Sequence, residues 1–308
     1  MKKAFFLVFI LSISTYAIIY AQHHAVNGHK TNINWQSAIV KIESIQQRYN
    51  VEQADVLLHK QIDTIKGLSQ HDKFERQGEL LTIRDTIRGT GILISSGNGI
   101  YLVTAKHIVK ATENSGNEAE SINDLISIKA YAGKLISNNI PLMNLSAPST
   151  SLRPFVFSSD AEDIAVISLQ KKSYKAIVAY LKQIGCKAVL TQIIGEAKNN
   201  DKVSVVGFPA LPDASVNNIT TTEGAIETTT ATGFKVQVPV YPGNSGSPVI
   251  QNEKLIGILS FQSGINNNID AALHPYQKAN SAMATKSALI LQLLKQLQAN
   301  EKRIGFNN

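Results

Sequence analysis

Short β-rich runs separated by turn residues fill much of the sequence between residues 80 and 261, and they constrain the fold more than any other feature. Ser96-Gly97-Asn98-Gly99 lies between two of these runs and predicts a hairpin, because Asn and Gly tolerate the left-handed backbone that tight turns need. Many short strands with turns between them predict a barrel or sandwich architecture. The runs cover residues 80–83, 91–95, 100–104, 125–131, 164–169, 203–206, 225–229, 234–240, 248–250 and 255–261.

Apolar residues at helical spacing predict helices in three places. Residues 35–49 and 51–68 are expected to form one or two amphipathic helices, within an N-terminal extension spanning 22–76, that cover a hydrophobic face of the strands. Residues 173–183 show the same period midway between the β-rich halves. Residues 285–298 are expected to form a C-terminal helix.

The N-terminus has the pattern of an export signal. Lys2 and Lys3 precede an almost unbroken apolar stretch over residues 4–20, and Ala21 is a small residue at which cleavage would occur. An uncleaved membrane anchor is the alternative, because residues 4–20 approach the length that spans a bilayer. We therefore expect residues 1–21 to direct the chain to the periplasm or outside the cell, with membrane contact only if the segment stays attached.

Composition excludes several function classes. The chain has 308 residues and a formal net charge of +7, but no run of five Lys or Arg residues, so no nucleic-acid partner is expected. Cys186 is the single cysteine, which rules out an internal disulfide and predicts a buried thiol. The sequence lacks the paired-histidine spacings of metal hydrolases and carboxylate-rich loops, so neither a metal nor another cofactor is predicted.

Three segments carry residues suited to nucleophilic chemistry. His107 follows a predicted strand, Asp163 precedes one, and Ser245 lies between two glycines in a turn flanked by prolines. A lone His or Asp at a strand end is commonly structural. The Gly-bracketed serine is more unusual, because such a turn can present a side chain and backbone N–H groups to one point.

Together these segments resemble the trypsin-like, or chymotrypsin-fold, serine peptidases, and most closely the bacterial Deg-type protease domains without PDZ domains. The order His, Asp, Ser is that of this family. The resemblance implies a mainly β fold over residues 77–300, with two six-stranded antiparallel β-barrels, one over about 77–170 and one over about 200–282. The matching segments are Gly89-Thr90-Gly91, Thr104-Ala105-Lys106-His107, Asp163-Ile164-Ala165-Val166, Val205-Val206-Gly207-Phe208-Pro209, Gly243-Asn244-Ser245-Gly246-Ser247-Pro248 and Leu255-Ile256-Gly257-Ile258.

The resemblance also implies roles. His107 would be the general base, Asp163 would orient it, and Ser245 would be the nucleophile that attacks a protein or peptide substrate. The N–H groups of Gly243 and Ser245 would form the oxyanion hole. Asp160, Glu162 and Asp85 are the other acids that would serve in place of Asp163.

Two departures from the family pattern leave a second interpretation open. Ser247 replaces a glycine after the nucleophile. Gln262 replaces the last residue of a segment, Ser260-Phe261-Gln262, that would bind an extended substrate. The alternative is a non-catalytic protein of the same fold that binds peptides or a protein partner in the groove.

Overall fold

The computed structural model describes residues 33–49, 82–110, 125–131, 135–142, 154–199, 201–210, 219–262 and 278–303. All elements named below lie in these ranges and belong to one compact unit formed by residues 34–308. Within these ranges no helix has the length and apolar character needed to cross a membrane.

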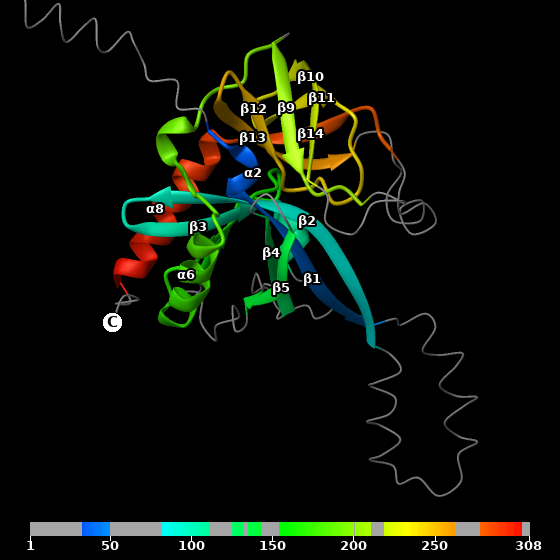
Figure 1. Cartoon of the computed structure of the whole chain (residues 1–308). Coiled ribbons are helices and arrows are strands. Elements are labelled where there is room, and N and C mark those ends of the chain that lie inside the picture. The colour runs from blue at the N-terminus through cyan, green and yellow to red at the C-terminus, as the bar shows by residue number, and fades with distance from the viewer. Residues whose placement is uncertain are drawn as a thin grey trace, which may run out of the picture. The chain divides into compact units, whose positions relative to one another are not determined.

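The first half of the unit is an eight-stranded sheet (Figure 1). Its main path runs β5-β4-β1-β2-β3-β7-β6 with antiparallel pairing, and β8 joins β2 in parallel. The predicted hairpin is confirmed: Ser96 pairs with Gly99, and Gly97 has a φ of +58°. The strands are β1 (Ile39–Tyr49), β2 (Thr82–Ser96), β3 (Gly99–Thr104), β4 (Leu125–Tyr131), β5 (Leu135–Leu142), β6 (Phe155–Phe157), β7 (Ala165–Ser168) and β8 (Val189–Leu190).

The helix predicted over residues 35–49 is wrong beyond its first turn. Helix α2 covers only Trp35–Ala38, and the chain then becomes β1, which lies between β2 and β4. Ile39, Val40 and Ile42 are all fully buried, so both faces of this strand are covered and the alternating pattern of a half-buried strand is lost. β-branched side chains favour a strand there. The predicted helix over 51–68 lies outside the described residues.

The second half contains the predicted six-stranded barrel, closed in the order β10-β11-β14-β13-β12-β9. The first half differs from the expectation, since its described strands form an eight-stranded sheet that includes β1 and is not closed. The barrel strands are β9 (Lys202–Gly207), β10 (Thr220–Thr229), β11 (Gly233–Gln237), β12 (Pro248–Gln251), β13 (Lys254–Gln262) and β14 (Ala282–Lys286).

Each half has its own core. Val40, Leu102 and Ile167 belong to the cluster on the first sheet, and Phe234 and Leu259 belong to the cluster of the barrel. Burying an aliphatic or aromatic side chain of this size contributes roughly 1.5–3 kcal/mol. The first sheet and the barrel thus each have a hydrophobic core, and the segments that follow or precede their strands carry the candidate site.

Helices complete the unit. The 3-10 turn η2 (Lys172–Tyr174) leads into α6 (Lys175–Gln183), which confirms the helix predicted midway along the chain. A second 3-10 turn, η3, covers Thr191–Ile193. The C-terminal helix is also confirmed as α8 (Ala288–Arg303), although it begins after β14 and extends further than expected. Cys186 is buried, as predicted.

Candidate active site

His107 lies on the short helix α5 (Lys106–Val109), directly after β3. Ala105, Ile108 and Val109 are fully buried and anchor this turn in the first core. The His107 side chain is 45% exposed, in contrast to its neighbours. The local sequence therefore fixes the backbone tightly and leaves one imidazole at the surface.

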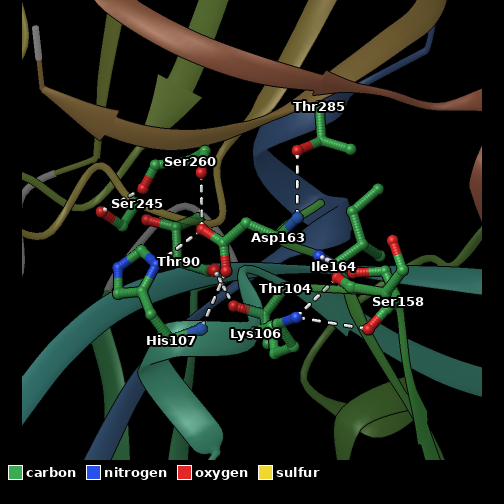
Figure 2. A network of polar contacts seen from close by, with 11 residues as sticks. Thr90, Thr104, Lys106, His107, Ser158, Asp163, Ile164, Ser245, Ser260 and Thr285 are labelled. Carbon is green, nitrogen blue, oxygen red and sulfur yellow. Dashed lines mark hydrogen bonds and ion pairs between the residues drawn. The ribbon is translucent and has the colours of Figure 1, made fainter. Parts of the chain in front are cut away.

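Asp163 lies in the loop before β7 and accepts three hydrogen bonds (Figure 2). Its Oδ2 lies 2.6 Å from Nδ1 of His107 and also accepts from the Ser260 hydroxyl at 2.6 Å. Its Oδ1 accepts from the His107 backbone N–H at 2.9 Å. The Asp163 N–H donates to the Thr285 hydroxyl at 3.3 Å. The carboxylate is thus held in one orientation toward the imidazole.

The pKa of Asp163 lies below its ordinary value of 3.8. Burial raises the pKa, but the hydrogen bond and charge of His107, with the hydroxyl of Ser260, outweigh burial and stabilise the ionised form. The other acids contact different groups: Asp160 pairs with Lys106 at 3.6 Å, and Glu162 accepts from the Ser159 hydroxyl at 2.9 Å. The Asp85 side chain lies outside the described set.

Lys106 is a buried cation between His107 and the Asp163 loop. Its ammonium group donates to the carbonyls of Ser159 at 2.7 Å and Ser158 at 3.2 Å (Figure 2). The base of the same loop is closed by Ser158, whose N–H donates to the Ile164 carbonyl at 2.9 Å. The hydrogen bonds of Lys106 therefore join the loop that carries Asp163 to the helix that carries His107.

Ser245 lies in the loop before β12. Its hydroxyl donates to the Ser260 carbonyl at 3.1 Å, and the Ser260 hydroxyl in turn donates to Asp163. His107, Asp163 and Ser245 are thus joined in one network through Ser260 (Figure 2). Within the part of the chain that the structure describes, no hydrogen bond joins the Ser245 hydroxyl directly to His107.

Two backbone hydrogen bonds fix the loop that carries Ser245. The Pro242 carbonyl accepts from the Ala210 N–H at 2.7 Å, and the Asn244 carbonyl accepts from the Ser247 N–H at 3.0 Å. Gly243 has a φ of +94°, which favours glycine, and a Cβ there would collide with the Phe208 carbonyl. Across the described residues, the N–H groups of Gly243 and Ser245 have no acceptor.

Ser260, Phe261 and Gln262 end strand β13. The pairing register with β14 shifts between Leu259 and Phe261, so Ser260 sits at a bulge. Bulges re-aim side chains next to functional sites, and here the hydroxyl of Ser260 points to Asp163. The backbones of Phe261 and Gln262 pair with β14, and the structure does not describe their side chains.

The sequence matches the model of the trypsin-like peptidase domain over residues 89–258, more than half of the chain. The chain belongs to the trypsin-like peptidase family. Among solved structures, one titled "HtrA-type protease AlgW with decapeptide" is similar at 15% identity and a TM-score of 0.45. The similarity covers 86% of this chain and 65% of that one, so this chain spans just under two thirds of that protein's length.

The departure at Ser247 is accommodated in this structure. Ser247 is fully buried, and its hydroxyl faces Gly207, where any Cβ would collide with it. The hydroxyl of Ser247 and the side-chain oxygen of Asn244 are buried without a hydrogen-bond partner in the described structure. The absence of a side chain at Gly207 thus makes room for the serine behind the Ser245 loop.

Sequence reasoning missed three residues that hold the site together: Lys106, Thr285 and Thr90, whose hydroxyl donates to the Gly243 carbonyl at 3.0 Å. Lys106 and Thr90 lie within the quoted motifs but had no assigned role, and nothing in the sequence around Thr285 indicates that it meets Asp163. Only the fold brings these side chains to the site. The described residues include no cluster of three or more His, Cys, Asp or Glu side chains that would hold a metal ion.

Proposed function

We propose that this trypsin-like peptidase is an exported serine endopeptidase that hydrolyses peptide bonds with His107, Asp163 and Ser245. The observation that carries the proposal is the 2.6 Å hydrogen bond between Nδ1 of His107 and Asp163, in a network that also includes Ser245. Nucleophilic serine catalysis requires a base, and the base requires a group that orients it.

Asp163 determines which nitrogen of His107 carries the proton. An ionised carboxylate accepts only, so it favours the tautomer with a proton on Nδ1 and leaves the lone pair of Nε2 free. Nε2 then takes the proton of the Ser245 hydroxyl, while Asp163 stabilises the imidazolium that forms. The hydroxyl must first turn away from the Ser260 carbonyl, to which it now donates.

In the first step, Oγ of Ser245 bonds to the substrate carbonyl carbon, its proton passes to Nε2, and the carbonyl π electrons move onto oxygen. The intermediate then collapses, the carbon–nitrogen bond breaks, and the leaving amine takes the proton from Nε2. Water repeats both steps on the acyl-enzyme and releases the acid and Ser245.

The N–H groups of Gly243 and Ser245 are proposed to stabilise the oxyanion. In a trans peptide the N–H points opposite to the carbonyl of the preceding residue, and the described structure contains no cis peptide. Since the Pro242 carbonyl is bound by Ala210 and the Asn244 carbonyl is bound by Ser247 within the loop, both N–H groups point away from those contacts. Donors fixed before the reaction cost no reorganisation in the transition state.

The proposed substrate is an extended segment of a protein or peptide. In the described strands, β12 pairs with β13 only as far as Ile258, and Leu259 is bonded to Gly246 and Ser247 of the Ser245 loop. From Ser260 on, β13 has no strand partner on this side among the described strands. A substrate strand would pair with Ser260 and its neighbours along this edge. The proposed export depends on Lys2, Lys3 and the apolar residues 4–20; the intact mass of the exported protein would reveal whether this segment is cleaved.

The proposal is tested by turnover of an unfolded protein and of a peptide library. We expect wild-type cleavage, and a loss of about 10⁶-fold in kcat for Ser245→Ala and for His107→Ala. Asp160→Asn is the matched control, because Asp160 is exposed and does not contact His107. A folded, monodisperse wild type that binds peptides without cleaving them would contradict the proposal and favour the non-catalytic groove protein.

A further inference from the structure

Thr90 is a fully buried residue of β2 that reaches from the first sheet to the loop before β12 of the barrel. Its hydroxyl donates to the Gly243 carbonyl at 3.0 Å, and its backbone N–H donates to the Ser245 carbonyl at 2.8 Å. The same hydroxyl accepts from the Phe208 N–H at 3.0 Å. One residue therefore holds the loop of the nucleophile at two carbonyls and a neighbouring segment at a third point.

These contacts act on the two proposed oxyanion donors. Thr90 binds the carbonyls of Gly243 and Ser245, and each carbonyl belongs to the peptide that follows the one carrying that residue's N–H. These bonds therefore restrict rotation at Gly243 and Ser245, next to both proposed donors. Through Phe208 it also holds the segment whose Ala210 N–H fixes the Pro242 carbonyl. Since Gly243 is a glycine at positive φ, the peptides on both sides of it would rotate readily if these contacts were lost.

Thr90 is itself fixed from the side of His107. Its carbonyl accepts from the hydroxyl of Thr104 at 2.7 Å, and Thr104 ends β3 just before the helix that carries His107. Gly246 lies so close to the Thr90 carbonyl that a Cβ at this glycine would collide with it. A continuous chain of contacts thus joins the backbone of His107 to the loop of Ser245.

We propose that Thr90 is a positioning residue. Its hydroxyl fixes the Gly243 carbonyl on one side of that residue and, through Phe208, the segment that binds the Pro242 carbonyl on the other side. It thereby keeps the Gly243 N–H directed to the oxyanion and the Ser245 loop aligned with His107. This inference rests on the proposed peptidase function and deepens it. Every residue except proline keeps the backbone N–H that bonds the Ser245 carbonyl, so the hydroxyl is the part that mutation tests.

The experiment compares Thr90→Val and Thr90→Ser with the wild type in peptide hydrolysis. Valine keeps the shape of threonine but leaves the Gly243 carbonyl and the Phe208 N–H without their partner. Because losing one oxyanion donor costs about 10²–10³ in kcat, a displaced donor should lower kcat by about 10- to 100-fold. KM should change by less than about threefold, since the interaction is made in the transition state. Thr90→Ser keeps the hydroxyl and should restore kcat to within about threefold of wild type.

Ser287→Ala is the matched control. The Ser287 hydroxyl is also fully buried and donates to two backbone carbonyls, those of Leu255 at 2.8 Å and Gly195 at 3.1 Å, but it does not touch the Ser245 loop. This variant loses comparable hydrogen bonds and should keep wild-type kcat. The pH at which activity is half-maximal should be unchanged in all variants, because none alters a contact of the His107 ring.

A folded Thr90→Val protein with kcat within twofold of wild type would overturn the inference. A Thr90→Ser protein that loses as much kcat as Thr90→Val would overturn it too, because the hydroxyl would then not be the cause. If Thr90→Val does not fold, Thr90→Cys replaces it with the same expectation, since a thiol is a weak donor and acceptor. A wild type without turnover would instead refute the proposed function, and this inference with it.

Discussion

Replacing Asp163 with asparagine removes the acceptor that orients His107 while keeping the size and shape of the side chain. The carboxylate now accepts from Nδ1 of His107, the His107 backbone N–H and the Ser260 hydroxyl. An amide has one acceptor oxygen, and its NH₂ group cannot accept from Nδ1–H or from Ser260. If the oxygen keeps the bond to the His107 backbone, the NH₂ group faces Nδ1 and favours the tautomer with the proton on Nε2.

The predicted effect is large because the wrong tautomer cannot take the proton of Ser245. In a trypsin-type triad this change lowers kcat by about 10⁴-fold. At about 1.36 kcal/mol per factor of ten, that corresponds to about 5.4 kcal/mol of transition-state stabilisation. KM should change little, because the substrate does not contact Asp163 in the proposed mechanism.

Steady-state hydrolysis of a peptide substrate by Asp163→Asn and Asp160→Asn provides the measurement. Both variants make the same chemical change within one loop, but the Asp160 side chain is 95% exposed and contacts Lys106 rather than His107. We expect Asp160→Asn to keep kcat within about threefold of wild type, since exposed ion pairs contribute little. The reasoning is refuted if a folded Asp163→Asn protein retains wild-type kcat, or if Asp160→Asn loses activity instead.

Three further changes test other parts of the structure. Gly243→Ala should abolish turnover and lower the free energy of unfolding, measured in urea, by about 1–3 kcal/mol. Alanine rarely adopts a φ of +94°, and its Cβ would collide with the Phe208 carbonyl. Normal turnover by this variant would contradict the prediction. Lys106→Met should lower the free energy of unfolding by about 1–3 kcal/mol, because the carbonyls of Ser158 and Ser159 lose their hydrogen-bond donor. An unchanged free energy of unfolding would refute the role of Lys106 in stabilising the Asp163 loop. Because the pKa of Asp163 is lowered in the fold, its stabilising contribution is complete above its ordinary value of 3.8 and lost as the pH falls through the lower folded pKa. The difference in unfolding free energy between wild type and Asp163→Asn should therefore become smaller as the pH falls below 3.8. A difference that grows below this pH would contradict the lowered pKa of Asp163.

The strands that the sequence predicted best are those with a turn signal beside them. The hairpin at Gly97 has local chemistry that specifies where a strand must reverse. Most strands of the barrel were predicted from β-rich runs between turn residues. Strand β14 was missed, because Ala282–Lys286 contains few of the β-branched and aromatic residues typical of a strand.

The largest error, the helix expected over residues 35–49, has a tertiary cause. Ile39 and Ile42 are spaced three residues apart, as on a helix face, but β1 is covered by neighbours on both faces and shows no alternation. A pattern read along one segment cannot reveal that two other strands lie beside it.

The residues of the candidate site also fall into two groups, those that local sequence indicates and those that only the fold brings together. Motifs indicated His107, Asp163 and Ser245, because each lies in a short segment whose chemistry is unusual. The contacts of Lys106, Thr90 and Thr285 join residues far apart in the sequence, and only strand pairing brings them together. The hydrogen bond from Ser245 to Ser260 likewise depends on the bulge in β13.

The central claim is that Ser245 is a nucleophile activated by His107, and labelling with a fluorophosphonate probe tests it most directly. Wild type, Ser245→Ala and His107→Ala would be treated side by side, and the adduct located by peptide mapping. We predict one phosphonylated residue, Ser245, in the wild type and no labelling of either variant on the same timescale. A folded wild type that stays unlabelled, an adduct on another residue, or equal labelling of His107→Ala would contradict the claim.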